Sequence, residues 1–166
     1  MLLIIMRHGI AEEGEPDEAR KLTPKGKERV VRIAKAMKSM GLKPDFYLCS
    51  HRVRAIQTAE AVMKVYGEKG EPRKTDDIDF YSPWEAFAAA VNGVTAGEPD
   101  NVTVLASGHQ PQVGMLVNMA LSGTDADMAL KKGCAVGISF EGNRLEAGQG
   151  TLEFALTHGA TRELKL

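Results

Sequence analysis

The chain has 166 residues, of which 43% are hydrophobic and 26% are charged, and its 21 basic and 22 acidic residues give a formal net charge of −1. This composition is typical of a soluble globular protein, and the length predicts one domain over residues 1–166 with a sizeable core. The near-balance of charge excludes a global field that would attract nucleic acid or an anionic membrane, so any anion site must be local.

The first predicted element is a short strand over residues 2–6, which ends abruptly at Arg7, His8 and Gly9. An unbroken apolar run of this kind is typical of a strand buried on both faces of a sheet. Residues 10–22 are polar and acidic and predict a surface loop. Ligands bind beyond the carboxyl ends of strands in open α/β sheets, so Arg7 and His8 lie either at a binding site or simply where the chain reaches the surface.

Apolar residues at helical spacing alternate with short apolar runs along the rest of the chain. Helices are predicted over residues 24–40, 55–66, 83–94 and 112–121, and strands over 46–49, 102–106, 135–140 and 151–156. Thr23 followed by Pro24 marks the start of the first helix as a capping hydroxyl before proline. The alternation of strands and helices predicts a three-layer α/β/α domain with a mostly parallel central sheet.

Cys49 and Cys134 are the two cysteines, and both lie in apolar, strand-like surroundings. This pattern favours buried, reduced thiols over a disulfide framework. The first residues carry no basic segment followed by a small-residue cleavage site, and the apolar run is too short for a membrane span. We therefore expect a cytoplasmic protein.

Three predicted strands end in polar clusters of the same kind: Arg7-His8-Gly9, the Ser-His-Arg-Val-Arg of residues 50–54, and the Ser-Gly-His of residues 107–109. If these strands are parallel neighbours, their ends lie about 4.8 Å apart along one edge of the sheet. Such a cluster of cations is costly unless an anion occupies it, and arginine presents a fork that matches phosphate oxygens. The clusters therefore predict a phosphoryl site. Gly9 and Gly108 have no Cβ, so the backbone at these positions could come close to the bound ligand.

The chemistry that these residue types support is phosphoryl transfer through a covalent intermediate. One imidazole can attack phosphorus while the second donates to the equatorial oxygens, and Arg7 and Arg54 can neutralise the charge on those oxygens. This scheme needs neither a metal nor a cofactor. A zinc site formed by His8, His51 and His109 is a rival, which the neighbouring arginines disfavour.

Four segments, in order along the chain, resemble the motifs of the histidine phosphatase superfamily, whose fold is phosphoglycerate-mutase-like. Arg7-His8-Gly9 resembles its signature triplet, and residues 22–26 resemble its Leu-Thr-x-x-Gly segment. Residues 49–59 are similar to its Ser-x-x-x-Arg-Ala-x-Gln-Thr-Ala motif, and Ser107-Gly108-His109 matches the segment of its second histidine. Order, spacing and length look most like the SixA subgroup of phosphohistidine phosphatases.

The resemblance implies that His8 is the phospho-accepting nucleophile and that Arg7, Arg54 and His109 form the phosphate pocket, with Gly9 and Ser50 as further substrate-binding residues. The chain departs from the family in two places. His51 stands where the family usually has proline, and its side chain could line the pocket or simply face solvent. Gln110 follows His109 where one branch of the family has an acid.

Most phosphoester hydrolysis needs a carboxylic acid to protonate the leaving alkoxide. Glu85 and Asp79 are the candidates for a general acid, because they lie in the segment where another branch of the family places one. If neither serves, the substrate must carry a good leaving group, which favours phosphohistidine on a partner protein. The alternatives are a small-molecule phosphomonoesterase and a non-catalytic phosphate-recognition module. None of these three functions implies a nucleic-acid or membrane partner.

Overall fold

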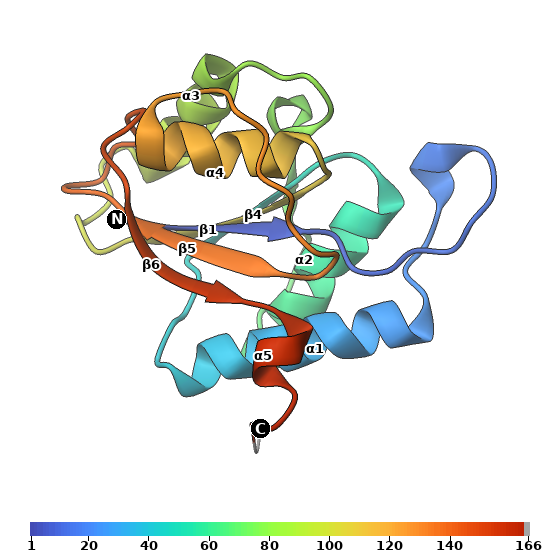
Figure 1. The fold of residues 1–166 in the computed structure, drawn as a ribbon. Coiled ribbons are helices and arrows are strands. Elements are labelled where there is room, and N and C mark those ends of the chain that lie inside the picture. The colour runs from blue at the N-terminus through green and yellow to red at the C-terminus, as the bar shows by residue number, and fades with distance from the viewer. Residues whose placement is uncertain (165–166) are drawn as a thin grey trace.

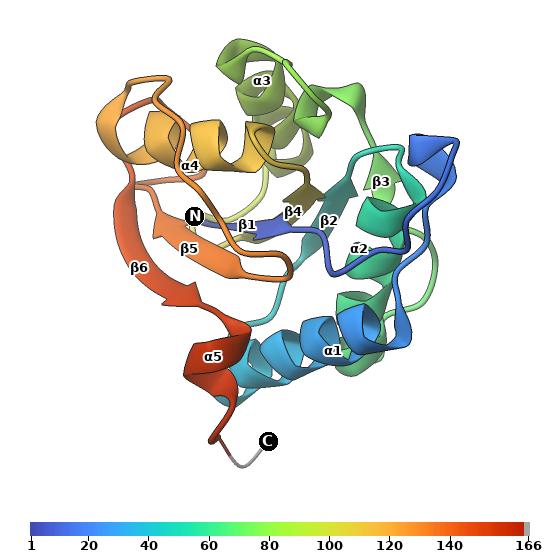
Figure 2. The same cartoon turned by 45° about the vertical axis from the view of Figure 1, so that its right-hand side comes forward.

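Six strands form one mixed sheet in this computed structural model, which describes residues 1–164 (Figures 1 and 2). Across the sheet the strands are β3 (Arg73–Lys74), β2 (Phe46–Cys49), β4 (Thr103–Gly108), β1 (Leu2–Arg7), β5 (Ala135–Ser139) and β6 (Thr151–Leu156). The pairs β3–β2, β2–β4 and β4–β1 are parallel, and β1–β5 and β5–β6 are antiparallel. The strand at the centre of the predicted site, β4, therefore lies between the other two.

Helices cover both faces of the sheet, as Figure 2 shows. One face carries α1 (Pro24–Ser39), α2 (Val53–Tyr66) and the short α5 (His158–Thr161), and the other carries α3 (Trp84–Thr95) and α4 (Gln112–Ser122). Two 3₁₀ turns, η1 (Asp17–Ala19) and η2 (Asp76–Ile78), lie in the connecting segments. None of the described helices is long and apolar enough to cross a lipid bilayer.

The first strand supplies side chains to both hydrophobic cores because successive residues of a strand point to opposite faces. Leu3 and Ile5 belong to the core under α3 and α4, whereas Ile4 and Met6 belong to the core under α1 and α2. All four side chains are fully buried. The rigid double-sided packing of β1 fixes the position of the residues that follow it, Arg7 and His8.

The predicted α/β fold is confirmed, with boundaries that shift by a few residues. Thr23 caps α1 through its side chain, which accepts from the Gly26 amide at 2.9 Å, and Gly67 ends α2 in the left-handed conformation. Strand β5 is antiparallel to β1, and β6 is antiparallel to β5, so neighbouring strands are parallel only on the side of the sheet from β3 to β1. The two-residue strand β3 has no apolar pattern, which is why the sequence did not reveal it.

Candidate active site

The ends of β1, β2 and β4 meet at one edge of the sheet. The strand register pairs Arg7 with Gly108, so His8 and His109 follow side by side. The two imidazole centroids lie 5.1 Å apart, and both side chains are buried. The structure thus brings together the two histidines that the sequence places 101 positions apart, as the predicted parallel neighbours require.

The ring of His8 is held in one orientation by hydrogen bonds at both nitrogens. Nδ1 donates to the carbonyl oxygen of Gly9 at 2.7 Å, and Nε2 accepts from Nε of Arg54 at 3.3 Å. An arginine can only donate, so the proton lies on Nδ1 and the lone pair on Nε2. Burial lowers the pKa of His8 to about 4, and the charges of Arg54 and Arg7 add to this effect. His8 is therefore neutral at pH 7, and its Nε2 is unprotonated.

We expect side-chain NMR to find the imidazole of His8 neutral, with its proton on Nδ1, as the pH falls from 8 to 5. Protonation should begin only as the pH approaches about 4. Because the unfolded chain protonates near pH 6.5, the folded state should also lose stability as the pH falls from about 6.5 toward about 4. Titration of His8 near pH 6.5 in the folded protein would contradict this description of its imidazole.

The second imidazole, His109, has one free nitrogen that faces no partner among the described residues. Its Nε2 lies 2.6 Å from Oγ of Ser50, while its buried Nδ1 has no hydrogen-bond partner. Burial lowers the pKa of His109 to about 2, helped by His8 and Arg54. Nε of Arg7 is a second buried donor without a partner. A phosphoryl oxygen bound between these side chains would satisfy both nitrogens.

The start of α2 is tied directly to the segment that carries His8. Oγ1 of Thr58 donates to the Arg54 carbonyl at 2.7 Å and accepts from the amide of Gly9 at 3.1 Å. A Cβ at Gly9 would lie 2.9 Å from Cγ2 of Val30, so this glycine is required by packing against α1. The amide and carbonyl of Gly9 are both occupied, so Gly9 positions His8 and the expected backbone approach to a ligand has no support. Gly108 likewise packs against Ile78.

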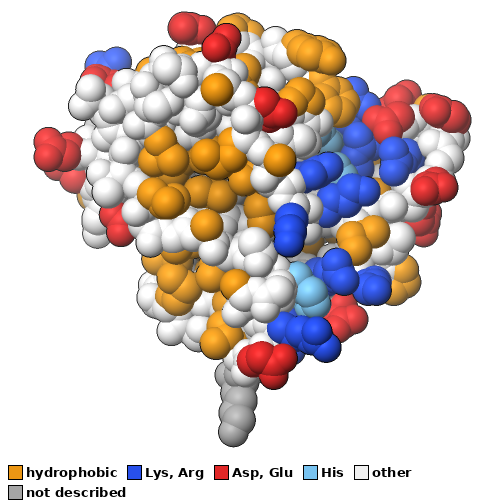
Figure 3. All heavy atoms as spheres, in the orientation of Figure 1, with side chains coloured by type: hydrophobic (Ala, Val, Ile, Leu, Met, Phe, Trp, Pro, Cys, Tyr) orange, Lys and Arg blue, Asp and Glu red, His pale blue; other side chains and the backbone are white. Residues whose placement is uncertain are grey.

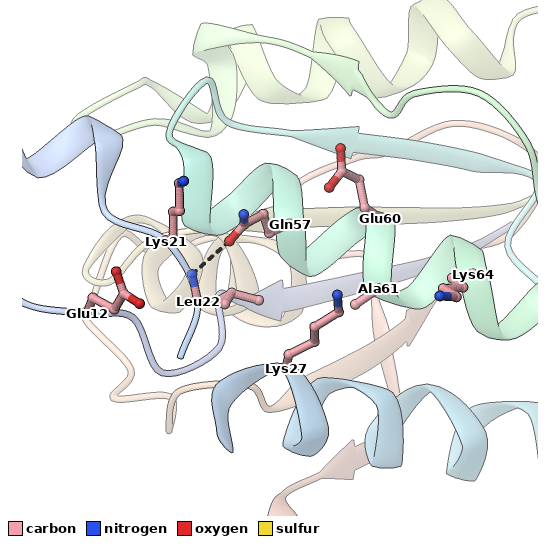
Figure 4. Close-up of a pocket in the computed structure, with 8 residues that line it drawn as sticks. All are labelled: Glu12, Lys21, Leu22, Lys27, Gln57, Glu60, Ala61 and Lys64. Carbon is pink, nitrogen blue, oxygen red and sulfur yellow. Dashed lines mark hydrogen bonds between the residues drawn. The ribbon is translucent and has the colours of Figure 1, made fainter. Parts of the chain in front are cut away.

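Residues 10–22, here called the acidic arm, project beside α2 and are pinned to it at their base (Figures 1 and 2). The amide of Leu22 donates to Oε1 of Gln57 at 2.7 Å, a bond drawn in Figure 4 beside the surface pocket between α1 and α2. Gln57 and Thr58 belong to the motif recognised in the sequence. Their role in the structure is to hold the arm and the first strand against the helix that carries Arg54.

The tip of the arm places a carboxylate on the arginines of the site, which the sequence did not predict. Arg54 donates from Nη1 to the Asp17 carbonyl at 2.6 Å and from Nη2 to Oδ2 at 2.9 Å, and Nη1 of Arg52 donates to the same Oδ2 at 2.6 Å. Burial tends to raise the pKa of Asp17, but hydrogen bonds from Arg54 and Arg20 outweigh it and lower the pKa to about 2. Asp17 is therefore ionised at neutral pH.

Arg52, at the start of α2, also lies in the site. Its Nε donates to Oδ1 of Asp79 at 2.9 Å, and its guanidinium stacks 4.5 Å from the centroid of Phe80. The Phe80 ring in turn lies 5.2 Å from that of His109. Asp79 Oδ1 is 4.0 Å from Nε2 of His109. No periodic pattern in the sequence marks Asp17 or Phe80, because both lie outside the longer helices and strands.

Two residues singled out in the sequence lie outside this cluster. Glu85 is exposed on the first turn of α3, where it lines a surface pocket with Trp84, Met115 and Met119. No hydrogen bond or ion pair connects it to the imidazoles within residues 1–164, so the geometry does not support Glu85 as the general acid. His51 has a side chain that is 53% exposed and lies 3.4 Å from Asp76, so it faces solvent and not the other two histidines.

Charge is distributed unevenly around the site, as the space-filling view shows. Lysine and arginine side chains gather with histidine on the face where β1 ends, and acidic side chains cover the projecting arm (Figure 3). Lys132 is near enough to His8 to lower its pKa, and Nη1 of Arg7 donates to the Leu130 carbonyl from the segment before β5. The surface around the end of β1 thus carries mostly positive side chains, which suits a dianion.

The comparisons with known proteins agree with the geometry. A family model described as histidine phosphatase superfamily (branch 1) matches residues 3–80. An uncharacterised protein of Picosynechococcus sp. (strain ATCC 27264 / PCC 7002 / PR-6) is 32% identical over 162 residues, 95% of this chain and 96% of that one. The model match ends at residue 80, before His109, whereas the alignment with the relative covers 95% of this chain.

Solved structures of similar fold include phosphatases for different substrates. The protein histidine phosphatase SixA complexed with tungstate has a TM-score of 0.82 at 24% identity, covering 96% of this chain and 98% of its own. A protein from Nakamurella multipartitia, described as a phosphohistidine phosphatase SixA, has a TM-score of 0.72 at 25% identity over 93% and 94%. A phosphoserine phosphatase mutant from Entamoeba histolytica in complex with phosphoserine has a TM-score of 0.64 at 17% identity, covering 98% of each chain.

Proposed function

The chain belongs to the histidine phosphatase superfamily, and we propose that it removes phosphate from a phosphohistidine side chain of a partner protein through a covalent intermediate at His8. In this proposal Arg7, Arg54 and His109 hold the phosphoryl oxygens. The unprotonated Nε2 of His8, which Arg54 contacts, and the unsatisfied Nδ1 of His109 support these roles.

The reaction has two displacements at phosphorus. In the first, Nε2 of His8 forms a bond to phosphorus while the bond from phosphorus to the substrate nitrogen breaks, and the electron pair leaves with the substrate imidazole. In the second, water forms the new bond to phosphorus, the bond to Nε2 breaks, and inorganic phosphate leaves. The charge that develops on the equatorial oxygens is stabilised by guanidinium groups already fixed in the pocket.

The observation that carries the choice of substrate is the state of Asp79. Among the described residues, Asp79 is the carboxylate within 4.0 Å of a site imidazole, and its Oδ1 accepts from both Arg52 Nε and the Phe80 amide. An oxygen engaged in this way is poorly placed to carry a proton to a leaving alkoxide. A phosphoimidazole protonated on its other ring nitrogen leaves as neutral imidazole, so its proton is already on the leaving group.

A small-molecule phosphomonoesterase is the second candidate. It is favoured by one observation, the proximity of Asp79 to His109, because rotation of Arg52 would free the carboxylate to act as an acid. The phosphoserine-bound neighbour demonstrates that the same fold accommodates an ester substrate in another protein. The two candidates differ in whether Asp79 is needed for turnover.

The test compares two substrates of one enzyme preparation. A small protein phosphorylated by phosphoramidate on a single exposed histidine is one substrate, and a sugar phosphate is the other. We expect kcat/KM to favour the phosphohistidine protein by at least about 100-fold, the discrimination that one missing proton donor produces. The Asp79→Asn variant should retain activity on phosphohistidine to within about threefold, because no acid is needed. Equal turnover of the sugar phosphate, abolished in Asp79→Asn, would establish the esterase instead.

A further inference from the structure

We infer that Asp17 is a positioning residue, which holds one end of the Arg54 guanidinium so that the opposite edge presents its donors to a phosphoryl group on His8. This inference rests on phosphoryl transfer at His8, as proposed above, but not on the identity of the leaving group. Asp17 touches neither the nucleophile nor the site where phosphorus would lie, and its effect is exerted through Arg54.

A guanidinium can bind an anion along two different edges. Nη1 and Nη2 form one edge, and both donate to Asp17. Nη1 donates to the backbone carbonyl of Asp17 at 2.6 Å, and Nη2 donates to its carboxylate at 2.9 Å. Nε and the remaining N–H of Nη2 form the other edge. Nε lies 3.3 Å from Nε2 of His8, so this second edge faces the nucleophile. Phosphate and Asp17 can therefore bind Arg54 at the same time.

The carboxylate of Asp17 is itself firmly oriented. Oδ1 accepts from Nη1 of Arg20 at 2.8 Å, and Oδ2 accepts from Nη1 of Arg52 at 2.6 Å in addition to Arg54. The base of the arm is held by the bond from Leu22 to Gln57 (Figure 4). A side chain whose two oxygens are both held, on an arm pinned to the same helix as Arg54, can define the rotamer of that arginine.

The rival interpretation is that Asp17 is a resident anion that competes with phosphate for the arginines. It predicts the opposite result, because removal of a competitor raises the affinity of the pocket for an anion. Removal of a positioning residue loosens Arg54, and the affinity for an anion that mimics the transition state falls. Orthovanadate, which adopts a trigonal bipyramidal geometry on a nucleophile, is the probe that separates the two.

The experiment is a double-mutant cycle read out with p-nitrophenyl phosphate and orthovanadate. Asp17→Ala should lower kcat by about 30-fold and weaken vanadate inhibition by about tenfold. Asp17→Asn keeps an acceptor oxygen, so its kcat should fall by only about fivefold. In an Arg54→Ala background, adding Asp17→Ala should lower kcat by less than about threefold, because the arginine through which Asp17 acts is already absent. Glu18→Ala, a change of the exposed neighbour on the same turn, should stay within about twofold of the wild-type.

Three results would overturn the inference: an equal loss from Asp17→Ala in both backgrounds, tighter vanadate binding in Asp17→Ala or Asp17→Asn, or no change in either variant. An equal loss would mean that Asp17 only folds the arm. Because the ester and vanadate report on the pocket directly, failure to hydrolyse a phosphohistidine protein would reject the substrate assignment without affecting this cycle. If Asp17→Ala does not fold, the cycle is completed with Asp17→Asn.

Discussion

Replacement of His8 by alanine should abolish phosphatase turnover, with a fall in kcat of at least about 10,000-fold, because the covalent intermediate proposed above forms on the unprotonated Nε2 of His8. In the wild-type protein, rapid quench should trap a phosphoenzyme that is labile to acid and stable to alkali, and peptide mapping should place the phosphate on His8. The His8→Ala variant should form none.

The matched control is His51→Ala, which removes an imidazole that is exposed near the same strand ends. We expect it to retain turnover to within about twofold, since surface side chains away from the chemistry contribute little. Circular dichroism and thermal melting should find both variants folded. Substantial residual turnover in folded His8→Ala, or a phosphoenzyme on another residue, would remove His8 from the role of nucleophile.

The sequence was sufficient to predict the features of the fold that arise from local patterns. The apolar run before Arg7, the Thr23-Pro24 helix start and the clusters at three strand ends each have a physical cause within a few residues of chain. The strand register then converts those clusters into one pocket, because β2, β4 and β1 are parallel neighbours. The same clusters predict the convergence of His8 and His109, and the register of β1 and β4 brings it about.

The sequence was not sufficient to predict which irregular segments fold back over the pocket. Asp17 lies in an acidic loop whose composition predicts only solvation, yet the arm returns it to Arg54, 37 residues away. Arg52 begins a helix and has the pattern of a surface charge, but two carboxylates from separate loops meet its guanidinium. Gly9 was expected to let the backbone come close to a ligand, whereas in the structure its missing Cβ leaves room for Val30 of α1. Contacts of this kind depend on the conformation of loops, which leaves no repeating pattern of apolar residues in the sequence.

Replacement of Arg54 by alanine should lower kcat/KM by about 1,000-fold, the scale on which a guanidinium fixed against a transferring phosphoryl group acts. Arg54 is almost fully buried and is bound to both Asp17 and His8, so its removal also leaves the Asp17 carboxylate with one fewer cation to compensate its charge. Arg54→Lys keeps the charge but loses the two-edged planar fork, and we expect an intermediate loss of about 100-fold. Arg73→Ala, on the exposed strand β3, is the control and should change kcat/KM by less than about twofold.

The same variant makes a second measurable change, because the charge of Arg54 is one of the causes that lower the pKa of His8. In Arg54→Ala that pKa should rise from about 4 toward its ordinary value, and side-chain NMR should detect protonation of the ring at a higher pH than in the wild-type protein. Lower activity and a raised pKa together would mean that Arg54 acts on both the phosphoryl group and the nucleophile. Loss of activity with an unchanged pKa would restrict Arg54 to the phosphoryl oxygens, and retained activity would remove it from the pocket's chemistry altogether.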